Sequence, residues 1–169
     1  MPPESFEALA MPLFDRLYNF ACWLTQDRAE AEDLVQETYA KALKGFSSFQ
    51  PGTNFRAWMY RILRNAFLTS RAGMKQFVSL EDEDGEELVA AAEQTPEKIL
   101  LQRTEEELIR KALDGLPLHY REVLLLCDVE EMSYRDIAAT LGVPIGTVMS
   151  RLSRARRALR EAVSNLQGK

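Results

Sequence analysis

The chain has 169 residues, a net charge of −5 and 46% hydrophobic residues, which suits a globular protein of one domain or two small ones. Its longest unbroken apolar runs have five residues, as at 123–127, and are too short to cross a membrane, and its first ten residues do not resemble a signal peptide. We therefore expect a cytoplasmic protein without membrane insertion.

The charge is distributed unevenly along the chain. Residues 38–80 carry seven basic side chains and no acidic one, and residues 151–169 carry six basic and one acidic. Between them, residues 81–107 carry eleven acidic and two basic side chains. Two basic zones separated by an acidic one indicate two contacts with nucleic acid, despite the negative total.

Helical spacing of apolar residues predicts a first helix over residues 5–24. Asp27 is the expected N-cap of a second helix, which ends near Gly45. The sequence DLVQE lies in this second helix, with Leu34 and Val35 on its expected buried side. Three polar residues project elsewhere, and spacing alone favours a solvated face for them. They are Asp33, Gln36 and Glu37.

A loop over residues 45–53 precedes a third helix, for which Asn54 is the expected N-cap. Aromatic and arginine side chains interleave in this helix, a combination that suits unstacked bases and phosphates of single-stranded DNA. For Phe55 and Trp58 we favour packing against the core. For the other polar members we favour contact with nucleic acid: Arg56, Arg61, Arg64 and Asn65.

Residues 74–95 include the run EDEDGEE and are expected to form an acidic flexible linker. Thr95 is the expected cap of the next helix, which reaches Gly115, and another helix covers residues 120–127. No long segment alternates with a period of two. The predicted fold class is all-α, with two small helical bundles over residues 5–73 and 96–166.

Residues 133–160 have the pattern of a helix-turn-helix, with Ser133 as the first cap, Gly142 in the turn and Pro144 before the second helix. The second helix has an apolar stripe at positions 148, 152, 155 and 159, which predicts a buried side. Arg156 lies near that side, and we expect it to touch the backbone or an acid of its own domain. The remaining polar residues suit a DNA major groove: Thr147, Ser150, Arg151, Ser153, Arg154 and Arg157.

The sequence contains no Gly-rich phosphate loop and no nucleophile elbow, and we expect no cofactor. Cys22 and Cys127 lack metal-ligand spacing, so we expect no metal and two buried, reduced thiols. His119, the only histidine, is expected at the surface or in a cap. An enzyme is therefore the least favoured class.

Three stretches together resemble the ECF (extracytoplasmic function) group of sigma-70 RNA polymerase sigma factors. They are DLVQE, the loop with NFRAWMYRILRN, and GTVMSRLSRARRAL, in this order around an acidic linker. The resemblance covers about residues 10–165 and implies the minimal family form with regions 2 and 4. It implies binding to core RNA polymerase, at the β′ clamp helices and the β flap, and to promoter DNA.

The resemblance also implies roles for the polar residues. Asp33, Gln36 and Glu37 would bind the clamp helices, in place of a merely solvated face. Asn65, with the arginines of its helix, would read the −10 element, where the 45–53 loop closes a pocket over a flipped-out base. The helix-turn-helix would read the −35 element as duplex.

The resemblance further implies an anti-sigma partner. GTVMSRL, in which Met149 replaces the arginine of many members, is similar to a redox-responsive subgroup controlled by zinc-containing anti-sigma factors. Two alternatives remain: an adaptor that mimics a sigma factor and binds only an anti-sigma factor, and a helix-turn-helix regulator that acts without polymerase. The first needs an attached receiver domain or eroded arginines, and the second leaves the aromatic, arginine-rich helix unexplained.

Overall fold

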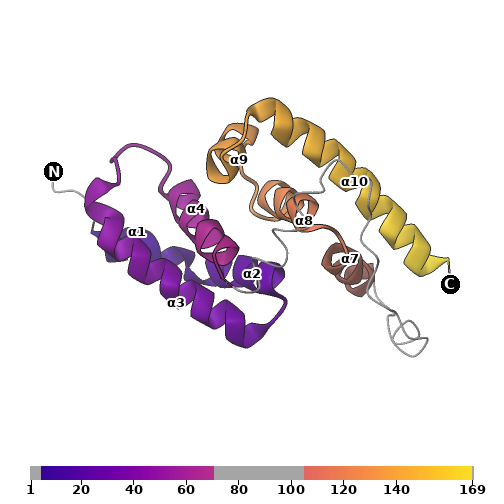
Figure 1. The fold of residues 1–169 in the computed structure, drawn as a ribbon, viewed down its shortest axis with the longest axis horizontal. Helices are drawn as coiled ribbons and strands as arrows, with labels where there is room; N and C mark the ends of the chain where they lie inside the picture. Colours follow the sequence, from indigo (N-terminus) through magenta and orange to yellow (C-terminus); the bar gives the residue numbers. More distant parts are fainter. Residues whose placement is uncertain (1–4, 71–104, 169) are drawn as a thin grey trace.

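The computed structural model describes residues 5–70 and 105–168, and all regular structure in these ranges is helical (Figure 1). The predicted all-α class is therefore confirmed. The N-terminal bundle contains α1 (Phe6–Ala10), a 3-10 turn (Met11–Leu13), α2 (Phe14–Thr25), α3 (Arg28–Gly45), a second 3-10 turn (Phe46–Ser48) and α4 (Phe55–Leu68). The C-terminal bundle contains α7 (Glu105–Asp114), α8 (Leu118–Leu124), a π-helical turn (Leu125–Val129), α9 (Tyr134–Leu141) and α10 (Ile145–Gln167).

The first predicted helix is interrupted by the 3-10 turn at residues 11–13. Pro12 stands at the start of this turn and has no backbone N–H, so a continuous α-helix would lose a hydrogen bond there and crowd the preceding turn. The prediction of one helix over residues 5–24 was therefore wrong in this respect.

Local caps set the ends of the helices as predicted. The Asp27 carboxylate accepts from the Glu30 N–H at 3.1 Å, the Asn54 Oδ1 accepts from the Ala57 N–H at 3.0 Å, and the Ser133 hydroxyl accepts from the Asp136 N–H at 3.0 Å. Gly142 ends α9 with a left-handed φ of 72°. The helix-turn-helix geometry therefore follows from residues next to the turn.

The N-terminal bundle is held together by α2 and α4, which both pack on α3. The buried side of α3 is the predicted one, and Leu34, Val35 and Thr38 all lie inside. Phe20 of α2 and Tyr60 of α4 meet in this core with ring centroids 5.2 Å apart. The exposed side of α3 therefore faces away from the bundle core.

In the C-terminal bundle, α10 packs along α7, α8 and α9 (Figure 1). Val148, Leu152 and Ala155 of α10 are buried, as the apolar stripe predicts, whereas Leu159, its fourth member, is half-buried. His119 is buried on α8, with its ring 4.5 Å from that of Tyr120, so the expected surface or cap position was wrong. The cause is the position of α8, which packs on α10 and, through Glu122, contacts α4 of the N-terminal bundle. Nearly all of its residues are therefore buried.

The two bundles lie against each other, with α4 packed on α9. Phe20 of α2 and Leu125 of the π-helical turn line the same cavity between them. The predicted linker over residues 74–95 and the expected cap Thr95 fall outside the described residues.

Candidate nucleic-acid and polymerase interfaces

The second helix of the helix-turn-helix presents one polar face to solvent. Ser150, Ser153, Arg154 and Arg157 are exposed on α10, opposite its buried apolar stripe. Thr147 and Arg151 are half-buried at the margins of this face. The structure therefore brings all six predicted −35 residues to one side of one helix, where small hydroxyls and arginines can approach a major groove.

Arg156 belongs to a different face of α10. Its guanidinium donates to the Asp128 carboxylate at 3.1 Å and lies 3.6 Å from the Cys127 sulfur. The predicted contact with an acid of its own domain is confirmed. This ion pair ties α10 to the π-helical turn and leaves Arg154, Arg157 and Arg160 as the exposed arginines of this helix.

The three polar residues of DLVQE lie on the exposed side of α3. Asp33, Gln36 and Glu37 are all solvent-exposed, while the intervening Leu34 and Val35 are buried. Glu37 forms an ion pair with Lys41, one turn further along, at 3.0 Å. The helix therefore offers two carboxylates and an amide as a rigid surface, which suits a basic partner.

The predicted −10 residues of α4 divide into two faces. Arg61 and Asn65, four residues apart, are exposed to solvent. Arg56 and Arg64 are half-buried and point toward the C-terminal bundle. The structure therefore brings only one pair of the four residues to the open surface.

The other pair contacts acidic and carbonyl groups across the interface between the bundles. Arg64 binds the Glu122 carboxylate through both Nε and a terminal nitrogen, at 2.8 and 3.1 Å. Arg56 donates to the Glu130 carbonyl at 2.8 Å, and the hydroxyl of Tyr60, which lies between them on α4, donates to the Glu130 carboxylate at 2.6 Å. A bidentate guanidinium–carboxylate pair is among the stronger polar contacts in proteins.

Sequence reasoning missed Tyr60, Glu122 and Glu130 in this interface. Glu122 is a single carboxylate among apolar residues of α8, and such a residue indicates a buried partner of opposite charge. Burial, together with the hydrogen bond to Glu130, raises the pKa of Tyr60 well above its usual range. Tyr60 therefore remains a proton donor at any physiological pH.

An aromatic cluster supports the loop before α4. The Phe49 ring lies 5.0 Å from that of Trp58 and 5.2 Å from that of Phe55, and Phe46 packs edge-on against Phe55 at 6.2 Å. Phe55 and Trp58 pack against the core, as favoured from the sequence. The cluster fixes the beginning of the 45–53 loop next to the helix that carries Arg61 and Asn65.

Asn54 uses both ends of its amide. Its oxygen caps α4, and its nitrogen donates to the Asp136 carboxylate of α9 at 2.6 Å. Asp136 occupies the position of a capping-box acid, yet its carboxylate binds the neighbouring bundle. One further polar contact therefore joins the N-terminus of α4 to the helix-turn-helix.

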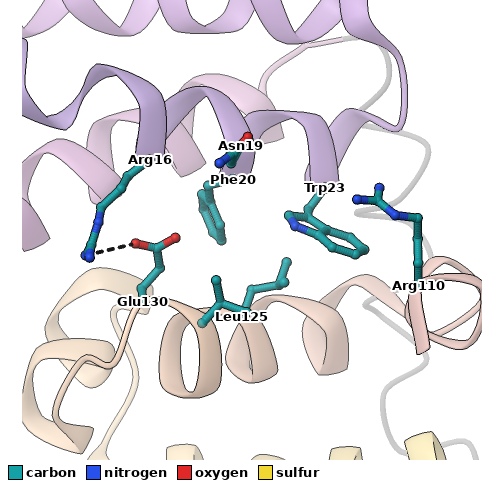
Figure 2. Close-up of a pocket in the computed structure, with 8 residues that line it drawn as sticks. Arg16, Asn19, Phe20, Trp23, Arg110, Leu125 and Glu130 are labelled. Atoms are coloured by element: carbon teal, nitrogen blue, oxygen red, sulfur yellow. Dashed lines mark ion pairs between the residues drawn. The ribbon is translucent and has the colours of Figure 1, made fainter. Parts of the chain in front are cut away.

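A cavity of about 380 Å³ lies between the bundles, lined by α2 on one side and by α7 and the π-helical turn on the other. Figure 2 shows Arg16 pointing toward Glu130, at 3.7 Å, and Arg110 above the ring of Trp23. The Arg110 guanidinium carbon is 4.7 Å from the centre of that ring, a cation–π distance. The two arginines that line the cavity therefore add polar contacts between the bundles.

In the ranges that the structure describes, no three His, Cys, Asp or Glu residues gather as metal ligands would. None of the described helices is long and apolar enough to span a membrane. Cys22 and Cys127 are free thiols and half-buried, so the expectation of buried thiols was only partly met. Burial and the neighbouring Asp128 raise the pKa of Cys127, which disfavours a reactive thiolate.

Two family models match the chain. The model of Sigma-70 region 2 matches residues 9–73, and the model of Sigma-70, region 4 matches residues 106–159. ECF RNA polymerase sigma factor SigE of Mycolicibacterium smegmatis is 39% identical over 160 residues, 93% of this chain and 61% of that protein. ECF RNA polymerase sigma factor EcfG of Rhodopseudomonas palustris is 41% identical over 83% of this chain and 75% of that protein.

Two solved structures are similar to this one. The sigma factor RpoE in its co-crystal structure with the anti-sigma factor NepR, from Bartonella quintana, gives a TM-score of 0.72 at 34% identity, over 94% of this chain and 96% of that one. CnrH in complex with the cytosolic domain of CnrY gives a TM-score of 0.65 at 23% identity, over 95% and 88% of the two chains, and supports the fold alone.

Proposed function

Since the chain belongs to the ECF group of sigma-70 RNA polymerase sigma factors, which are initiation factors and not enzymes, we propose that its two bundles divide promoter recognition between them. Sigma factors of this family bind core RNA polymerase and promoter DNA. In this chain, the N-terminal bundle docks on polymerase and reads the −10 element, and the C-terminal bundle reads the −35 element. The observation that carries the proposal is the exposure of three separate polar faces on α3, α4 and α10.

The proposed boundaries are residues 5–73 for the region 2 bundle, 74–95 for the linker and 96–166 for the region 4 bundle. The spans of the two family models, 9–73 and 106–159, support this division. The chain spans 61% of the length of SigE of Mycolicibacterium smegmatis.

The proposed polymerase contact is the α3 face of Asp33, Gln36 and Glu37. Its acidic character fits the β′ clamp helices, which are the family's docking site, and the β flap is the proposed second contact, made by the C-terminal bundle. Burial of Leu34 and Val35 fixes the rotation of α3 about its axis. The carboxylates of Asp33 and Glu37 are therefore held toward solvent by the helix itself.

Glu37→Lys is expected to weaken binding to core polymerase about tenfold, which corresponds to about 1.4 kcal/mol. The substitution reverses a charge that faces a basic partner, and at an exposed helical position it leaves the fold intact. The affinity is measured by the fluorescence anisotropy of the labelled chain as core polymerase is added.

The matched control is Glu7→Lys, which makes the same charge change on the exposed side of α1. Circular dichroism of both variants checks that helicity is retained. Equal affinity of Glu37→Lys and wild type for core polymerase would remove α3 from the docking surface.

For the −10 element, we propose that Asn65 and Arg61 make the first contacts, because both are exposed on α4 beside the aromatic cluster. An amide can read a base edge through a donor and an acceptor, and guanidinium groups follow the phosphates. Arg56 and Arg64 belong to the same proposed site and join it when their contacts with the C-terminal bundle are released.

Asn65→Ala is expected to cost about 1–3 kcal/mol of discrimination at one position of the −10 element, because a paired base contact is lost. Binding of the −35 element as duplex should not change. Transcription from a promoter library randomised at the −10 element measures this preference.

The control is Asn165→Ala, which removes the amide of an exposed asparagine near the end of α10. If the library preference of Asn65→Ala equals that of wild type at every position, Asn65 does not read a base.

An anti-sigma factor is the proposed regulator of this chain. The supporting observations are the structural similarity to RpoE bound to the anti-sigma factor NepR, and the open acidic face of α3, which a competing protein could cover. We also propose a cytoplasmic location for this chain, because core polymerase and promoter DNA are in the cytoplasm. Membership of the redox-responsive subgroup with a zinc-containing antagonist stays a prediction. In that case the antagonist, and not this chain, senses the oxidant.

The direct test of the proposed function is run-off transcription with purified core polymerase and a promoter upstream of genes that depend on this chain. We expect a specific transcript only when chain and core polymerase are both present. An adaptor would bind an anti-sigma factor and give no transcript. A regulator that acts alone would bind duplex DNA tightly without polymerase.

A further inference from the structure

The first two turns of α10 carry two exposed apolar residues, Ile145 and Met149, which we call the apolar flank. They are 43% and 52% exposed, and they lie four residues apart, so they are neighbours along one side of the helix. Single exposed apolar residues are common in proteins, whereas two neighbours beside a binding surface indicate a contact with another molecule.

The apolar flank borders the polar face of α10. With about 3.6 residues per turn, Met149 lies on one margin of this face and Arg151 on the opposite margin. Ser150 and Ser153 lie between them and are exposed. The two margins therefore differ in chemistry, because one can donate hydrogen bonds to base edges and the other can only form apolar contacts.

Gly146 permits a close approach at the same end of the helix. It is exposed one turn before Ser150, and a Cβ added to it would meet nothing of the described chain within 4 Å. Packing inside the chain therefore does not require glycine here, although glycine is unfavourable within a helix. The missing side chain instead leaves room for another molecule against the backbone. A DNA groove that approaches this closely also reaches the neighbouring apolar flank.

The flank becomes basic only further along the helix. Arg156, two turns after Met149, is bound to the Asp128 carboxylate at 3.1 Å, and Arg160 lies one turn beyond it. The residues near the N-terminus of a recognition helix are the ones that contact base edges. The part of the flank that can reach the bases is therefore apolar.

The major groove offers one protruding apolar group to such a flank. Thymine carries a C5-methyl group there, while the other distinguishing groups of the base pairs are hydrogen-bond donors and acceptors. Neither Ile145 nor Met149 has a side-chain donor, so burial of a methyl group is the favourable base contact open to both. The flexible thioether of Met149 can also follow an irregular surface.

We propose that the apolar flank of α10 reads the C5-methyl groups of thymines in the −35 element. The proposal rests on the −35 role proposed above for α10 and adds an apolar specificity to the hydrogen-bonding one of its arginines. Burial of one methyl group is worth about a fourfold gain in affinity. Cytosine lacks this group, so the flank prefers thymine at the positions that it covers.

The test replaces single thymines by deoxyuridine, which removes the methyl group and keeps every hydrogen-bonding group of the base pair. Promoter duplexes carry the −35 block that transcription from a randomised library selects, and each thymine of this block, on either strand, is replaced in turn. The −10 element stays constant. The affinity of the complex of chain and core polymerase for each duplex is measured by competition with a labelled promoter.

The variants are the double variant Ile145→Ala with Met149→Ala, the single variant Met149→Ala, and Met149→Leu, which keeps an apolar side chain of similar size. The control is Ile109→Ala, which truncates an isoleucine of α7 that is 44% exposed, as Ile145 is 43% exposed. All these positions are exposed, and circular dichroism checks that each variant is folded. If the double variant unfolds, Met149→Ala decides the question.

We expect deoxyuridine to weaken wild-type binding about fourfold at one or more positions of the −35 block. The double variant should bind the thymine and deoxyuridine duplexes equally at those positions. Met149→Leu and Ile109→Ala should keep the wild-type pattern. Because the same duplexes are compared in every variant, an effect of the missing methyl group on DNA shape cancels.

Three results would overturn the proposal: a methyl effect that persists in the double variant, no methyl effect at any position in wild type, or a selected −35 block without thymine. If Arg154→Ala still changes the base preference in any of these cases, the −35 role of α10 stands and only the apolar flank is removed from base reading. If neither Arg154→Ala nor the double variant changes any preference, α10 does not read the −35 element.

Discussion

Leu152→Ala is expected to destabilise the C-terminal bundle by about 2–5 kcal/mol. Leu152 is 1% exposed and lies in the middle of the stripe by which α10 packs on the rest of this bundle. Truncation removes three carbons from a closely packed core and leaves a cavity. The long helix α10 cannot move far enough to fill this cavity. Urea unfolding followed by circular dichroism measures the loss.

The control for this substitution lies three residues away on the same helix. Met149 is 52% exposed, and Met149→Ala should change the free energy of unfolding by less than about 0.5 kcal/mol. The two variants also separate the effect of packing from the effect on DNA contact, because only Leu152→Ala should disturb the orientation of the polar face of α10. Similar stability of the two variants would mean that α10 is not anchored by its apolar stripe.

Arg154→Glu is expected to abolish recognition of the −35 element. Loss of an arginine–base contact costs about 1–3 kcal/mol, and a carboxylate placed against phosphate adds a repulsion of several kcal/mol. Arg154 is exposed on α10, opposite its buried stripe and beside Ser150 and Ser153, so nothing in its own bundle would compensate. Competitive binding to −35 duplex variants at two salt concentrations measures the effect.

Three milder variants distinguish base contacts from phosphate contacts on this face of α10. Arg154→Ala should change base preference, whereas Arg157→Ala should weaken all sequences alike and reduce the log–log salt slope by about one. Met149→Arg should give stronger and less selective binding, because an added cation attracts phosphate without reading a base. Equal losses for Arg154→Ala on every duplex would make Arg154 a phosphate contact and transfer base reading to Arg151 or Ser150.

The parts of the fold that depend on neighbouring residues could be predicted from the sequence. Asp27, Asn54 and Ser133 cap helices because each side chain reaches a backbone N–H three positions away. Gly142 was also predictable from its neighbours, because the left-handed backbone at the end of a helix favours a residue without a side chain. The break at Pro12 had its signal in the sequence as well, but the helical spacing of apolar residues continued through it.

The contacts between the bundles could not be predicted in this way. The partners of Arg64 and Tyr60 lie 58 and 70 residues further along the chain, and nothing in the local pattern selects Glu122 and Glu130 among 26 acidic residues. For the same reason the four polar residues of α4 looked equivalent. Docking of the C-terminal bundle divides them into an exposed pair and a covered pair.

We expect this chain, together with core polymerase, to read two separated promoter elements through two different helices. Transcription from a library randomised across both elements, with the 5′ ends of the transcripts sequenced, tests it most directly. We expect two preferred blocks at a fixed spacing, of which Asn65→Ala relaxes only the −10 block and Arg154→Ala only the −35 block. A single block that responds to both variants, or transcripts no more specific than those of core polymerase alone, would contradict the account.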